Sequence, residues 1–501
     1  MITQWIDQAA ASRGDASYLE DAAGAGALTF AGLRRAAAGW GRVFDQAGVD
    51  LGAAVALRLA DPLSYATALV AIVGAGRVVV PLDPAAPGSE LSRMLAVARP
   101  QAMVCDAIAD DLPAGLTVLR PASWPASWPA SWPTSWPTSS PAGEEEWPAG
   151  PAGTGGIFLC TSGTTGTPKG ILLRDDQLGH VAAAVAGHHR LSPADRGYCC
   201  LPLFHINAEV VGLLATLAAR ACLVLDGRFS RRGFWPLIEA RRITWINAVP
   251  AIITVLAMDP VFAPRSGVRF IRSASAPLAP ATLERFERAF GIPVVETYGM
   301  TEAASMITAN PLDGPRKAGS VGWPAGAEVR IVPVPGAGDP VGRVQIRGPG
   351  VITQYAAGGP AGAVDPEGWL DTGDLGRFDS DGYLFLAGRS DDVINRGGEK
   401  IYPRDIEDFL LGCDGVASAA VVAAPDTVLG ERPVAYVVPA GSWSPDKLEY
   451  ALREACAAGL PRAKRPSAFF VVEEMPLGPT GKIARRRLRE LATAPRRFSG
   501  R

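Results

Sequence analysis

Residues 157–170 read Ile157-Phe158-Leu159-Cys160-Thr161-Ser162-Gly163-Thr164-Thr165-Gly166-Thr167-Pro168-Lys169-Gly170. The apolar start predicts a β-strand, which opens into a loop of hydroxyl side chains and glycines that ends at a lysine. Glycines let the backbone approach an anion closely, hydroxyl and N–H groups donate to phosphate oxygens, and a lysine adds a positive charge. The spacing differs from that of a Walker A loop, because no Gly-Lys-Ser/Thr follows the first glycine at the required distance. The stretch therefore predicts a phosphate-binding loop of another type, with a flexible turn rich in Ser and Thr as the alternative.

The residues before this loop alternate between strand-like and helix-like patterns. The apolar stretches 54–58 and 77–82 predict strands, whereas 33–44 and 65–76 predict an amphipathic helix and a buried helix. The alternation resumes at Gly156 and is expected to continue to about Pro335. Strands that alternate with helices in this way predict an α/β fold with a largely parallel sheet.

The composition and the pattern of apolar residues change twice in the last third of the chain. Residues 341–388 are rich in Gly, Asp and short alternating runs, which predicts a β-rich subdomain. Beyond Arg389 a compact α+β unit is predicted from strand patterns at 416–422, 434–438 and 469–473 and helical patterns at 403–411 and 446–458. We therefore expect a large N-terminal domain of layered α/β subdomains plus the β-rich subdomain, residues 1–390, and a small mobile α+β domain, residues 391–501.

Length and composition narrow the class of protein. A chain of 501 residues exceeds what one hydrophobic core supports, and 48 Lys and Arg against 50 Asp and Glu give a formal net charge of −2. This balance argues against a globally basic nucleic-acid-binding protein. The seven cysteines show no metal-ligand spacing, and the start of the chain lacks a signal-peptide pattern. The longest apolar stretch is too short for a membrane span, so we expect a cytoplasmic enzyme without a nucleic-acid partner.

The segment 121–148 contains the short repeat Ala-Ser-Trp-Pro, which places a Trp before a proline at every fourth position from Trp124 to Trp136. A helix would align these Trp side chains, but each proline removes a backbone donor and clashes with the preceding turn. We therefore expect a low-complexity loop inside the large domain. A docking peptide and a repeat expansion in a surface loop are the two interpretations.

Four further motifs follow the phosphate-binding loop. They are Glu296-Thr297-Tyr298-Gly299-Met300-Thr301-Glu302, Gly368-Trp369-Leu370-Asp371-Thr372-Gly373-Asp374 with Gly388-Arg389-Ser390-Asp391-Asp392, Gly397-Gly398-Glu399-Lys400-Ile401-Tyr402-Pro403, and Pro479-Thr480-Gly481-Lys482-Ile483. Each alone is typical of an ordinary turn. In this order, from Leu28-Thr29-Phe30 to Lys482-Ile483, they make the chain resemble the adenylate-forming superfamily of acyl-CoA synthetases, peptide-synthetase adenylation domains and firefly luciferase. The Trp-Pro segment is a departure from that family's pattern.

The resemblance implies an ATP- and Mg²⁺-dependent ligase. It implies an ATP site made of Thr161, Ser162, Gly163, Thr164, Thr165, Gly166, Lys169, Ser275, Ala276, Pro277, Glu296, Thr297, Tyr298, Gly299, Met300, Thr301, Asp374, Arg389 and Lys482. Within that set the loop faces the β- and γ-phosphates, residues 275–277 and 296–298 border the adenine with the Tyr298 ring stacked on it, and Asp374 and Arg389 bind the ribose. Thr301 and Glu302 face the α-phosphate and the Mg²⁺ ion, a cation that prefers oxygen ligands.

The resemblance also implies catalysis in two conformations. A carboxylate that attacks the α-phosphate brings two anions together, and Lys482 would stabilise the charge that builds on the bridging oxygen and pyrophosphate. Asp391 matches the hinge about which the small domain swivels. In the second orientation the face formed by Gly397, Gly398 and Glu399 comes to the site, where coenzyme A attacks the acyl-adenylate.

The acid is less well defined by the sequence. The segment 201–209 matches the family's acyl-pocket segment, so His205 either gates the carboxylate and assists catalysis or is a core histidine bonded to the backbone. The predicted pocket consists of His205, Asn207, Val249, Ala251, Ala274 and Gly299. Its small residues suggest room for a bulky group, and no acidic residue typical of amino-acid activation is present at Ile206-Asn207. A fatty, aryl or polycyclic carboxylic acid is therefore expected.

The acceptor and the class of protein leave alternatives. The leading prediction is an acyl-CoA synthetase, and the near alternative is a stand-alone ligase that loads an acyl carrier protein or releases the adenylate. The basic residues Arg462, Lys464 and Arg465 either contact CoA phosphates or form a solvated face. A non-catalytic acyl or nucleotide sensor is the alternative from another class, against which the intact Thr165, Glu302, Asp374 and Lys482 argue.

Overall fold

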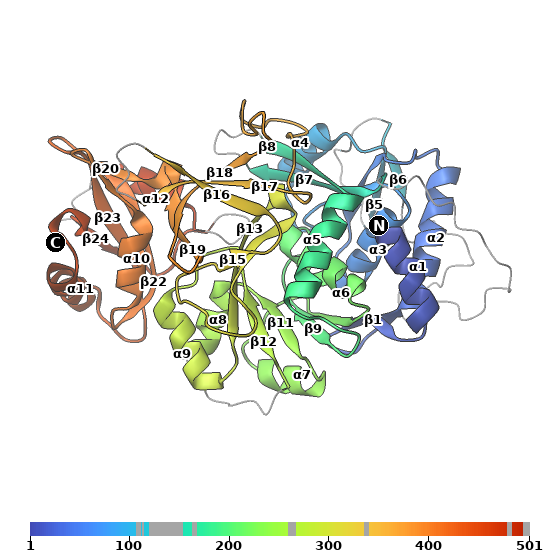
Figure 1. The fold of residues 1–501 in the computed structure, drawn as a ribbon, viewed down its shortest axis with the longest axis horizontal. Coiled ribbons are helices and arrows are strands. Elements are labelled where there is room, and N and C mark those ends of the chain that lie inside the picture. The colour runs from blue at the N-terminus through green and yellow to red at the C-terminus, as the bar shows by residue number, and fades with distance from the viewer. Residues whose placement is uncertain are drawn as a thin grey trace.

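The structure is a computed structural model, and it describes residues 1–106, 112, 115–119, 154–162, 168–258, 267–334, 340–477 and 483–493. In these residues the strands form four sheets, and the C-terminal sheet lies at one end of an elongated molecule (Figure 1). Five predicted ATP-site residues, Gly163, Thr164, Thr165, Gly166 and Lys482, lie outside the described residues. So does the Trp-Pro segment 121–148.

A six-stranded sheet carries the predicted phosphate-binding loop. Its spatial order is β6 (Thr117–Leu119), β5 (Ala102–Cys105), β3 (Ala54–Arg58), β4 (Val78–Pro81), β7 (Gly156–Ser162) and β8 (Pro168–Arg174). All neighbours are parallel except the β7–β8 pair. The helices α3 (Pro62–Gly74) and α4 (Gly88–Ala98) belong to this part of the chain. Helix α3 is buried from Leu63 onward, which confirms the predicted buried helix.

A nine-stranded sheet forms the centre of the molecule. Its order is β15 (Trp323–Pro324), β14 (Ser305–Ala309), β13 (Val294–Met300), β12 (Phe270–Ser273), β11 (Trp245–Ala248), β9 (Arg196–Cys199), β10 (Cys222–Leu225), β1 (Ser17–Asp21) and β2 (Ala27–Thr29). The strands from β13 to β1 are parallel, and buried residues dominate them, as is usual where helices cover both faces.

The helices of this region follow the predicted α/β alternation. They are α1 (Ile2–Arg13), α2 (Phe30–Gln46), α5 (Asp175–His188), the π-helix η2 (Asn207–Leu214), α6 (Ala215–Ala218), α7 (Phe234–Ala240), α8 (Pro250–Ala257) and α9 (Pro280–Phe290). Thr29 caps α2 by accepting a hydrogen bond from the Gly32 amide, so the Leu28-Thr29-Phe30 motif ends a strand and starts a helix. None of the described helices is long and apolar enough to cross a bilayer.

The β-rich region begins earlier than the sequence predicted. Its four antiparallel strands are β16 (Glu328–Pro333), β17 (Gly342–Arg347), β18 (Leu370–Phe378) and β19 (Leu384–Arg389). The expectation that the α/β pattern continues to about Pro335 is therefore wrong, because β16 already pairs with β17. Its residues Glu328–Pro333 are half-buried or exposed, and Val329, Arg330 and Ile331 alternate as in an antiparallel strand with one solvated face.

The C-terminal region contains a five-stranded sheet. Its strands are β21 (Glu399–Ile401), β20 (Ile394–Arg396), β23 (Gly430–Pro439), β22 (Val416–Asp426) and β24 (Phe469–Val471), and its helices are α10 (Pro403–Leu411), α11 (Pro445–Gly459) and α12 (Arg485–Thr493). The 3₁₀ turn η4 (Ser390–Asp392) connects β19 of the four-stranded sheet to β20. The predicted α+β composition of this region is confirmed.

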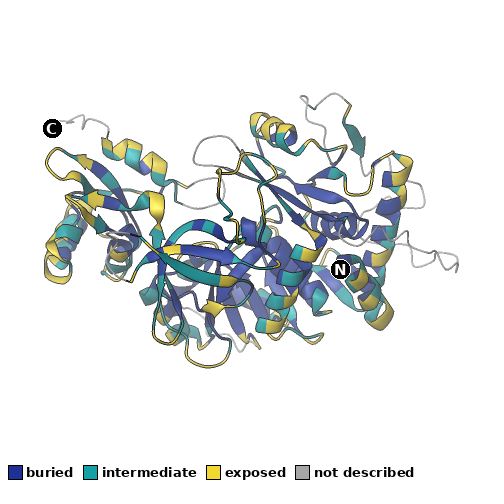
Figure 2. Ribbon diagram, turned by 45° about the horizontal axis from the view of Figure 1, so that its top comes forward, coloured by how far each residue is buried: buried dark blue, intermediate teal, exposed yellow. Residues whose placement is uncertain are grey.

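The hydrophobic core divides at the turn Ser390–Asp392. One cluster of buried side chains extends from Ile2 to Leu384 and joins the nine-, six- and four-stranded sheets. Two separate clusters, which include Ile406 and Val434, cover the five-stranded sheet. Figure 2 shows this burial along the central strands and exposed residues on the outer helices. A smaller cluster, which includes Ala56 and Val80, lies on the six-stranded sheet, so none of the clusters among the described residues spans the turn 390–392. This is what two units that move relative to each other require.

Candidate active site

The strands β7 and β8 bring the two ends of the predicted phosphate-binding loop together. They form an antiparallel ladder from Gly156↔Arg174 to Ser162↔Pro168, so Thr161 stands opposite Lys169. Gly170 belongs to this ladder and also bonds a second segment. Its amide donates to the carbonyl of Ala357 at 2.8 Å, and its carbonyl accepts from the Ala356 amide at 2.9 Å. The loop therefore begins and ends on a rigid hairpin that is fastened to the segment around 355–357.

A contact chain leads from Lys169 to the Tyr-Gly motif. The Lys169 Nζ atom lies 5.4 Å from the ring centroid of Tyr355, a cation–π distance. The Tyr355 hydroxyl donates to Glu302 Oε1 at 2.9 Å. Glu302 belongs to the turn η3 (Thr301–Ala303), which directly follows β13, and its carbonyl accepts from the Ile352 amide at 2.9 Å. The structure thus orients the predicted Mg²⁺ ligand from a segment that the sequence motifs do not include.

The chemistry of Glu302 fits a magnesium site. Glu302 is buried, with 8% exposed, and its carboxylate oxygens are the hard ligands that Mg²⁺ requires. In the described part of the chain no three His, Cys, Asp or Glu side chains cluster closely enough to hold an ion. A Mg²⁺ ion here would therefore be held by Glu302 together with phosphate oxygens and water, the usual arrangement for a nucleotide-bound magnesium.

The predicted ribose ligands are joined to the predicted adenine ligand. The Tyr298 hydroxyl donates to Asp374 Oδ2 at 2.5 Å, and Arg389 Nη1 donates to Asp374 Oδ1 at 3.2 Å. Arg389 is also held by the Thr372 carbonyl at 2.8 Å. Burial, with the nearby Asp374 carboxylate adding to it, raises the pKa of Tyr298 well above its usual value, so the phenol stays protonated and donates. Tyr298 of β13 and Arg389 of β19 therefore both bond the carboxylate of Asp374 on β18.

The remaining residues predicted to border the adenine divide into exposed and buried ones. Ser275, Ala276 and Pro277 are exposed at the carboxyl end of β12, and Ser275 has a positive φ of 75°. Thr297 is buried and donates to the Ser273 carbonyl at 3.2 Å, which ties β13 to β12. Glu296 is also buried and accepts from the Leu278 amide at 3.3 Å. Glu296 thus supports the 275–278 segment from within, and Thr297 supports the end of β12 that precedes it.

The buried position of Glu296 predicts a pH-dependent stability. Burial raises its pKa to about 7, against an ordinary glutamate value of about 4.3 in an unfolded chain. Because the folded-state pKa is raised, the stabilisation is fully present below about pH 4.3 and is lost as the pH rises through about 7. Glu296→Gln should therefore gain about 2–3 kcal/mol relative to the parent protein between pH 5 and pH 8. Denaturant unfolding across this range measures the effect, and a constant difference between the two proteins would contradict it.

The residues of the predicted acyl pocket come from four elements. His205 is half-buried and packs edge-on against Phe204, Asn207 begins η2, Ala274 follows β12, and Val249 and Ala251 lie at the start of α8. A Cβ atom on Gly299 would lie 1.4 Å from the Ser305 carbonyl oxygen. The close approach of β14 therefore requires glycine at 299, so its small size is no measure of room for the acid.

Polar side chains that the sequence analysis missed lie behind this pocket. Arg272 Nη1 donates to Asn207 Oδ1 at 2.7 Å and to Asn247 Oδ1 at 3.2 Å. Asn207 Nδ2 in turn donates to the exposed Ser275 Oγ at 3.2 Å. An arginine within the buried strand Phe270–Ser273 is a sequence signal that could have been noticed, whereas Tyr355 carries no local signal.

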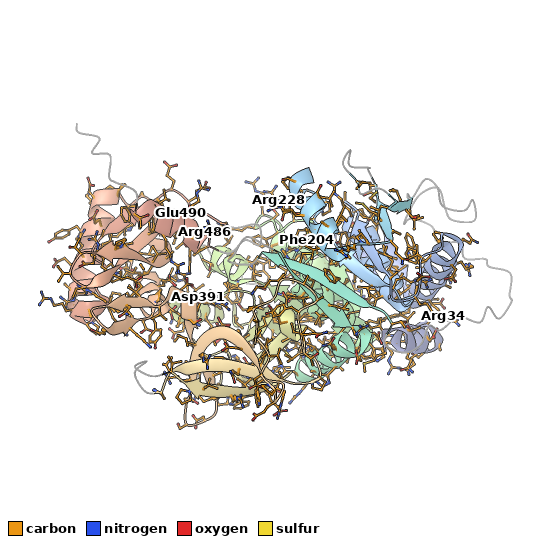
Figure 3. All side chains as sticks on the ribbon, turned by 90° about the horizontal axis from the view of Figure 1, so that it is seen from above. Arg34, Phe204, Arg228, Asp391, Arg486 and Glu490 are labelled. Atoms are coloured by element: carbon orange, nitrogen blue, oxygen red, sulfur yellow. The ribbon has the colours of Figure 1, made fainter. Side chains whose placement is uncertain are left out.

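The predicted hinge lies in the turn between the two cores. Asp391 is exposed at the junction of the four-stranded and five-stranded sheets (Figure 3). Its carbonyl accepts from Arg489 Nη2 at 3.2 Å, and Arg489 also pairs with the Asp392 carboxylate. Gly397 and Gly398 of the predicted thiol-binding face have positive φ values of 61° and 92°, and the neighbouring Glu399 is exposed. The hinge is thus fastened to α12 by a cation.

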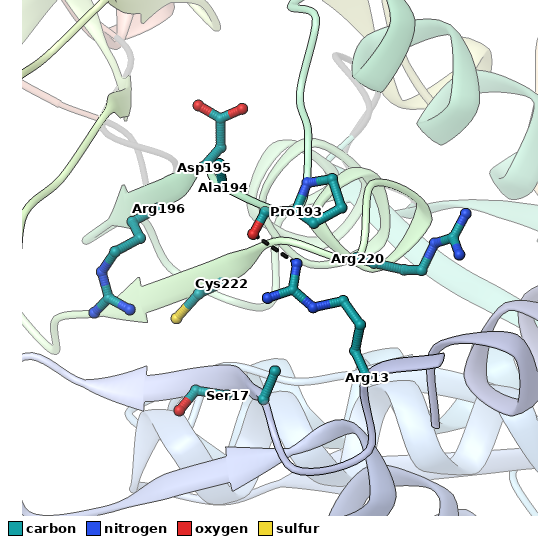
Figure 4. Close-up of a pocket in the computed structure, with 9 residues that line it drawn as sticks. Arg13, Ser17, Pro193, Ala194, Asp195, Arg196, Arg220 and Cys222 are labelled. Atoms are coloured by element: carbon teal, nitrogen blue, oxygen red, sulfur yellow. Dashed lines mark hydrogen bonds between the residues drawn. The ribbon is translucent and has the colours of Figure 1, made fainter. Parts of the chain in front are cut away.

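A cavity elsewhere in the molecule contains none of the predicted site residues. It lies where the strands β1, β9 and β10 begin, and there Arg13 Nη1 donates to the Pro193 carbonyl at 2.7 Å (Figure 4). Its lining includes Arg13, Asp195, Arg196 and Arg220. Arg196 is paired with Glu20 and Asp195 with Arg269, whereas Arg13 and Arg220 bond neutral oxygens, the Pro193 carbonyl and Ser12 Oγ.

Comparison with known proteins covers almost the whole chain. Residues 6–356 match the family model of AMP-binding enzymes, and residues 405–482 match that of the AMP-binding enzyme C-terminal domain. The chain is 38% identical over 489 residues to a sulfoacetate–CoA ligase of Cupriavidus necator, which covers 95% of this chain and 94% of that protein. It is 39% identical over 343 residues to an oxalate–CoA ligase of Arabidopsis thaliana, covering 66% of each.

Solved structures share the fold over the same extent. ATP-bound MatB from Rhodopseudomonas palustris matches with a TM-score of 0.81 and 27% identity, covering 98% of this chain and 99% of that one. An o-succinylbenzoate CoA synthetase from Bacillus subtilis, in complex with ATP and magnesium, matches with a TM-score of 0.81 and 27% identity over 97% and 98%. The resemblance inferred from the motifs is confirmed, and the chain belongs to the AMP-binding enzyme family of the adenylate-forming superfamily.

Proposed function

We propose that this chain is an AMP-forming acid–CoA ligase. It uses ATP to convert a carboxylic acid into an acyl-adenylate with release of pyrophosphate, and then transfers the acyl group to the thiol of coenzyme A with release of AMP. Membership of the AMP-binding family and a full-length relative that is a CoA ligase support this activity. Several further relatives are also named as CoA ligases, among them a 2-succinylbenzoate–CoA ligase and an indoleacetate–CoA ligase.

The observation that carries the proposal is two groups of contacts, linked by the segment 298–302, that join motifs far apart in the sequence. Lys169 lies over Tyr355, and Tyr355 bonds Glu302. Four residues before Glu302 in the same motif, Tyr298 bonds Asp374, and Asp374 pairs with Arg389. The first group offers a cation for phosphates and a carboxylate for a metal, and the second offers an aromatic ring for the base beside a carboxylate for the ribose.

Each group then has a role that its chemistry supports. The loop residues 161–166 and Lys169 donate to the β- and γ-phosphates, and Thr301 and Glu302 face the α-phosphate. Bound Mg²⁺ would neutralise phosphate charge there. Residues 275–277 and the Tyr298 ring border the adenine, while Glu296, Thr297, Gly299 and Met300 shape the strand beneath it. Asp374 accepts from the ribose hydroxyls, oriented by Tyr298 and Arg389.

The small domain supplies the catalytic cation and the second half-reaction. We assign Lys482 to the α-phosphate and bridging oxygen during adenylation, because a positive charge there stabilises the charge that develops. Residues 1–390 and 391–501 are assigned as the two bodies that swivel about Asp391. Gly397, Gly398 and Glu399 then approach the site and admit the thiol. Separate cores on the two sides of the turn support such a movement.

The acid binds beside the adenylate in the pocket of His205, Asn207, Val249, Ala251, Ala274 and Gly299. A fatty, aryl or polycyclic acid remains the expectation from the small residues of that pocket. The glycine requirement at 299 weakens this expectation, and the named acids of the relatives include the small sulfoacetate and oxalate.

Pyrophosphate release over a panel of carboxylic acids, with and without CoA, tests the proposal. We expect release that depends on one class of acid, and an acyl-CoA product when CoA is present. Release that CoA does not convert to a thioester, but an acyl carrier protein does, would favour the carrier-loading alternative. No release with any acid, despite measurable ATP binding, would contradict the proposal and favour a sensor.

A further inference from the structure

Arg272 is a buried cation without an anionic partner. Its side chain is 1% exposed on the central strand β12. The two groups that accept from its Nη1 atom, Asn207 Oδ1 and Asn247 Oδ1, are neutral amides, and its Nε atom has no partner among the described residues. No Asp or Glu in the described ranges forms an ion pair with it, whereas the neighbouring Arg269 is paired with Asp195. Arg272 therefore carries a charge that the described fold does not balance.

The other groups around Arg272 do not supply a negative charge. His188 and the fully buried His189 at the end of α5 are neutral, because burial and the nearby Arg272 charge lower both of their pKa values. Cys199 is buried as well, and burial raises the pKa of its thiol to about 11. Burial also lowers the pKa of Arg272 to about 9, which reflects the cost of holding the charge there. A buried charge of this kind is expensive unless a partner compensates it.

A row of hydrogen bonds connects this cation to the predicted acyl pocket. The Asn207 side-chain amide bonds Ser275 on one side and Arg272 on the other. Exposure falls along this row, since Ser275 is exposed, Asn207 is 7% exposed and Arg272 is 1% exposed. Asn207 and Ala274, which precedes Ser275 in the chain, are both residues of the predicted pocket. A substrate group that reaches the Asn207 amide is therefore one hydrogen bond away from the guanidinium.

A purely structural arginine would be a costly way to hold these strands together. Asn247 and Asn207 already bond to each other at 3.3 Å, so the amide pair connects β11 to η2 without the cation. Replacement of a buried charge by a well-packed apolar side chain is often neutral or stabilising. The charge needs a reason beyond packing, and an anion that arrives with the substrate provides one.

We propose that Arg272, together with Asn207 and Asn247, receives a second anionic group at the far end of the acid. The substrate is then a short dianion, with one carboxylate activated at the adenylate and a second carboxylate or a sulfonate held by the guanidinium in a paired, charge-assisted contact. This inference rests on the proposed function and names the substrate class for it. It replaces the expectation of a fatty, aryl or polycyclic acid.

Matched acid pairs test the inference. Pyrophosphate release is measured as kcat/KM for oxalate, malonate, succinate and sulfoacetate, each beside the analogue that lacks the distal charge: the monomethyl ester of each diacid, and methylsulfonylacetate. For at least one pair the parent protein should prefer the dianion by ~100-fold, the effect expected when one partner of a buried charge pair is removed. Arg272→Met should reduce this preference to about 1, and Arg272→Lys should keep part of it. Both kcat/KM values of a pair are measured on the same protein sample, so a smaller folded fraction lowers both equally and leaves their ratio unchanged.

Two further variants keep the test decisive if Arg272→Met folds poorly. Asn207→Asp places a carboxylate beside the guanidinium, so it should abolish the preference for dianions while leaving Arg272 satisfied. Arg269→Met removes a nearby arginine that has its own acid partner, and should leave the preference as in the parent.

An unchanged ratio in Arg272→Met and Asn207→Asp would overturn the inference, because a structural arginine lowers both members of a pair equally. So would a parent protein that uses fatty or aryl acids and none of the dianions, and in that case the proposed function stands. If no acid of any kind supports pyrophosphate release, the proposed function is wrong, and the inference falls with it.

Discussion

Replacing Lys482 with alanine should lower the rate of acyl-adenylate formation by at least ~100-fold, because loss of one preorganised charge at a developing anion costs about that much. The same variant should form the thioester from supplied acyl-adenylate at nearly the parental rate, since that step does not build charge on pyrophosphate. Leu477 and Ile483 pair through an isolated antiparallel bridge, so the chain is anchored on both sides of the segment that contains Lys482. Pyrophosphate release and thioester formation, followed separately, measure the two rates.

Lys447→Ala is the matched control for this prediction. Lys447 is exposed on α11, in the same C-terminal region, and should affect neither half-reaction when it is removed. An equal loss of both half-reactions in Lys482→Ala would refute the assigned role, because it would point to a general defect in folding or ATP binding.

Asp391→Pro should have the opposite pattern, with adenylation largely retained and thioester formation reduced by about two orders of magnitude. Proline fixes φ near −65°, so it removes a torsion that the hinge would use to reorient the small domain. The reorientation also has to release Arg489, which bonds the Asp391 carbonyl and the Asp392 carboxylate. Thioester formation from supplied acyl-adenylate is the measurement.

Asp391→Ala separates the torsion from the side chain. Alanine leaves φ free, so both half-reactions should continue at rates close to the parent's. If Asp391→Pro forms the thioester normally, the hinge lies elsewhere. If Asp391→Ala is as impaired as the proline variant, the carboxylate matters and the torsion does not.

Much of the fold could be predicted because local patterns and tertiary packing agree. The mostly apolar helix α3 is buried on every side, and Val78–Pro81 is a central strand as its β-branched residues indicate. The turn 390–392 could be located because the texture of the sequence changes there, and the structure places separate cores on its two sides. The strand β16 was placed with the α/β region because its alternating residues Val329, Arg330 and Ile331 do not tell which sheet it joins, and only its pairing with β17 shows that.

The site was predictable only as far as motifs reach. The sequence singled out Tyr298, Asp374 and Arg389 separately, and the fold brings them within hydrogen-bond distance of one another. Tyr355 was missed because its role depends on the neighbours that tertiary folding gives it, Lys169 and Glu302. An arginine in the apolar strand of Arg272 could have been noticed in the sequence, but the absence of an acidic partner for it among the described residues is a property of the packed interior.

A crystal structure of the protein with ATP and Mg²⁺ tests the central claim most directly. We predict the triphosphate against the 161–170 hairpin, the adenine on the Tyr298 ring, and the ribose hydroxyls on Asp374. A nucleotide bound away from these residues, with the Tyr298–Asp374 contact facing empty solvent, would contradict the account.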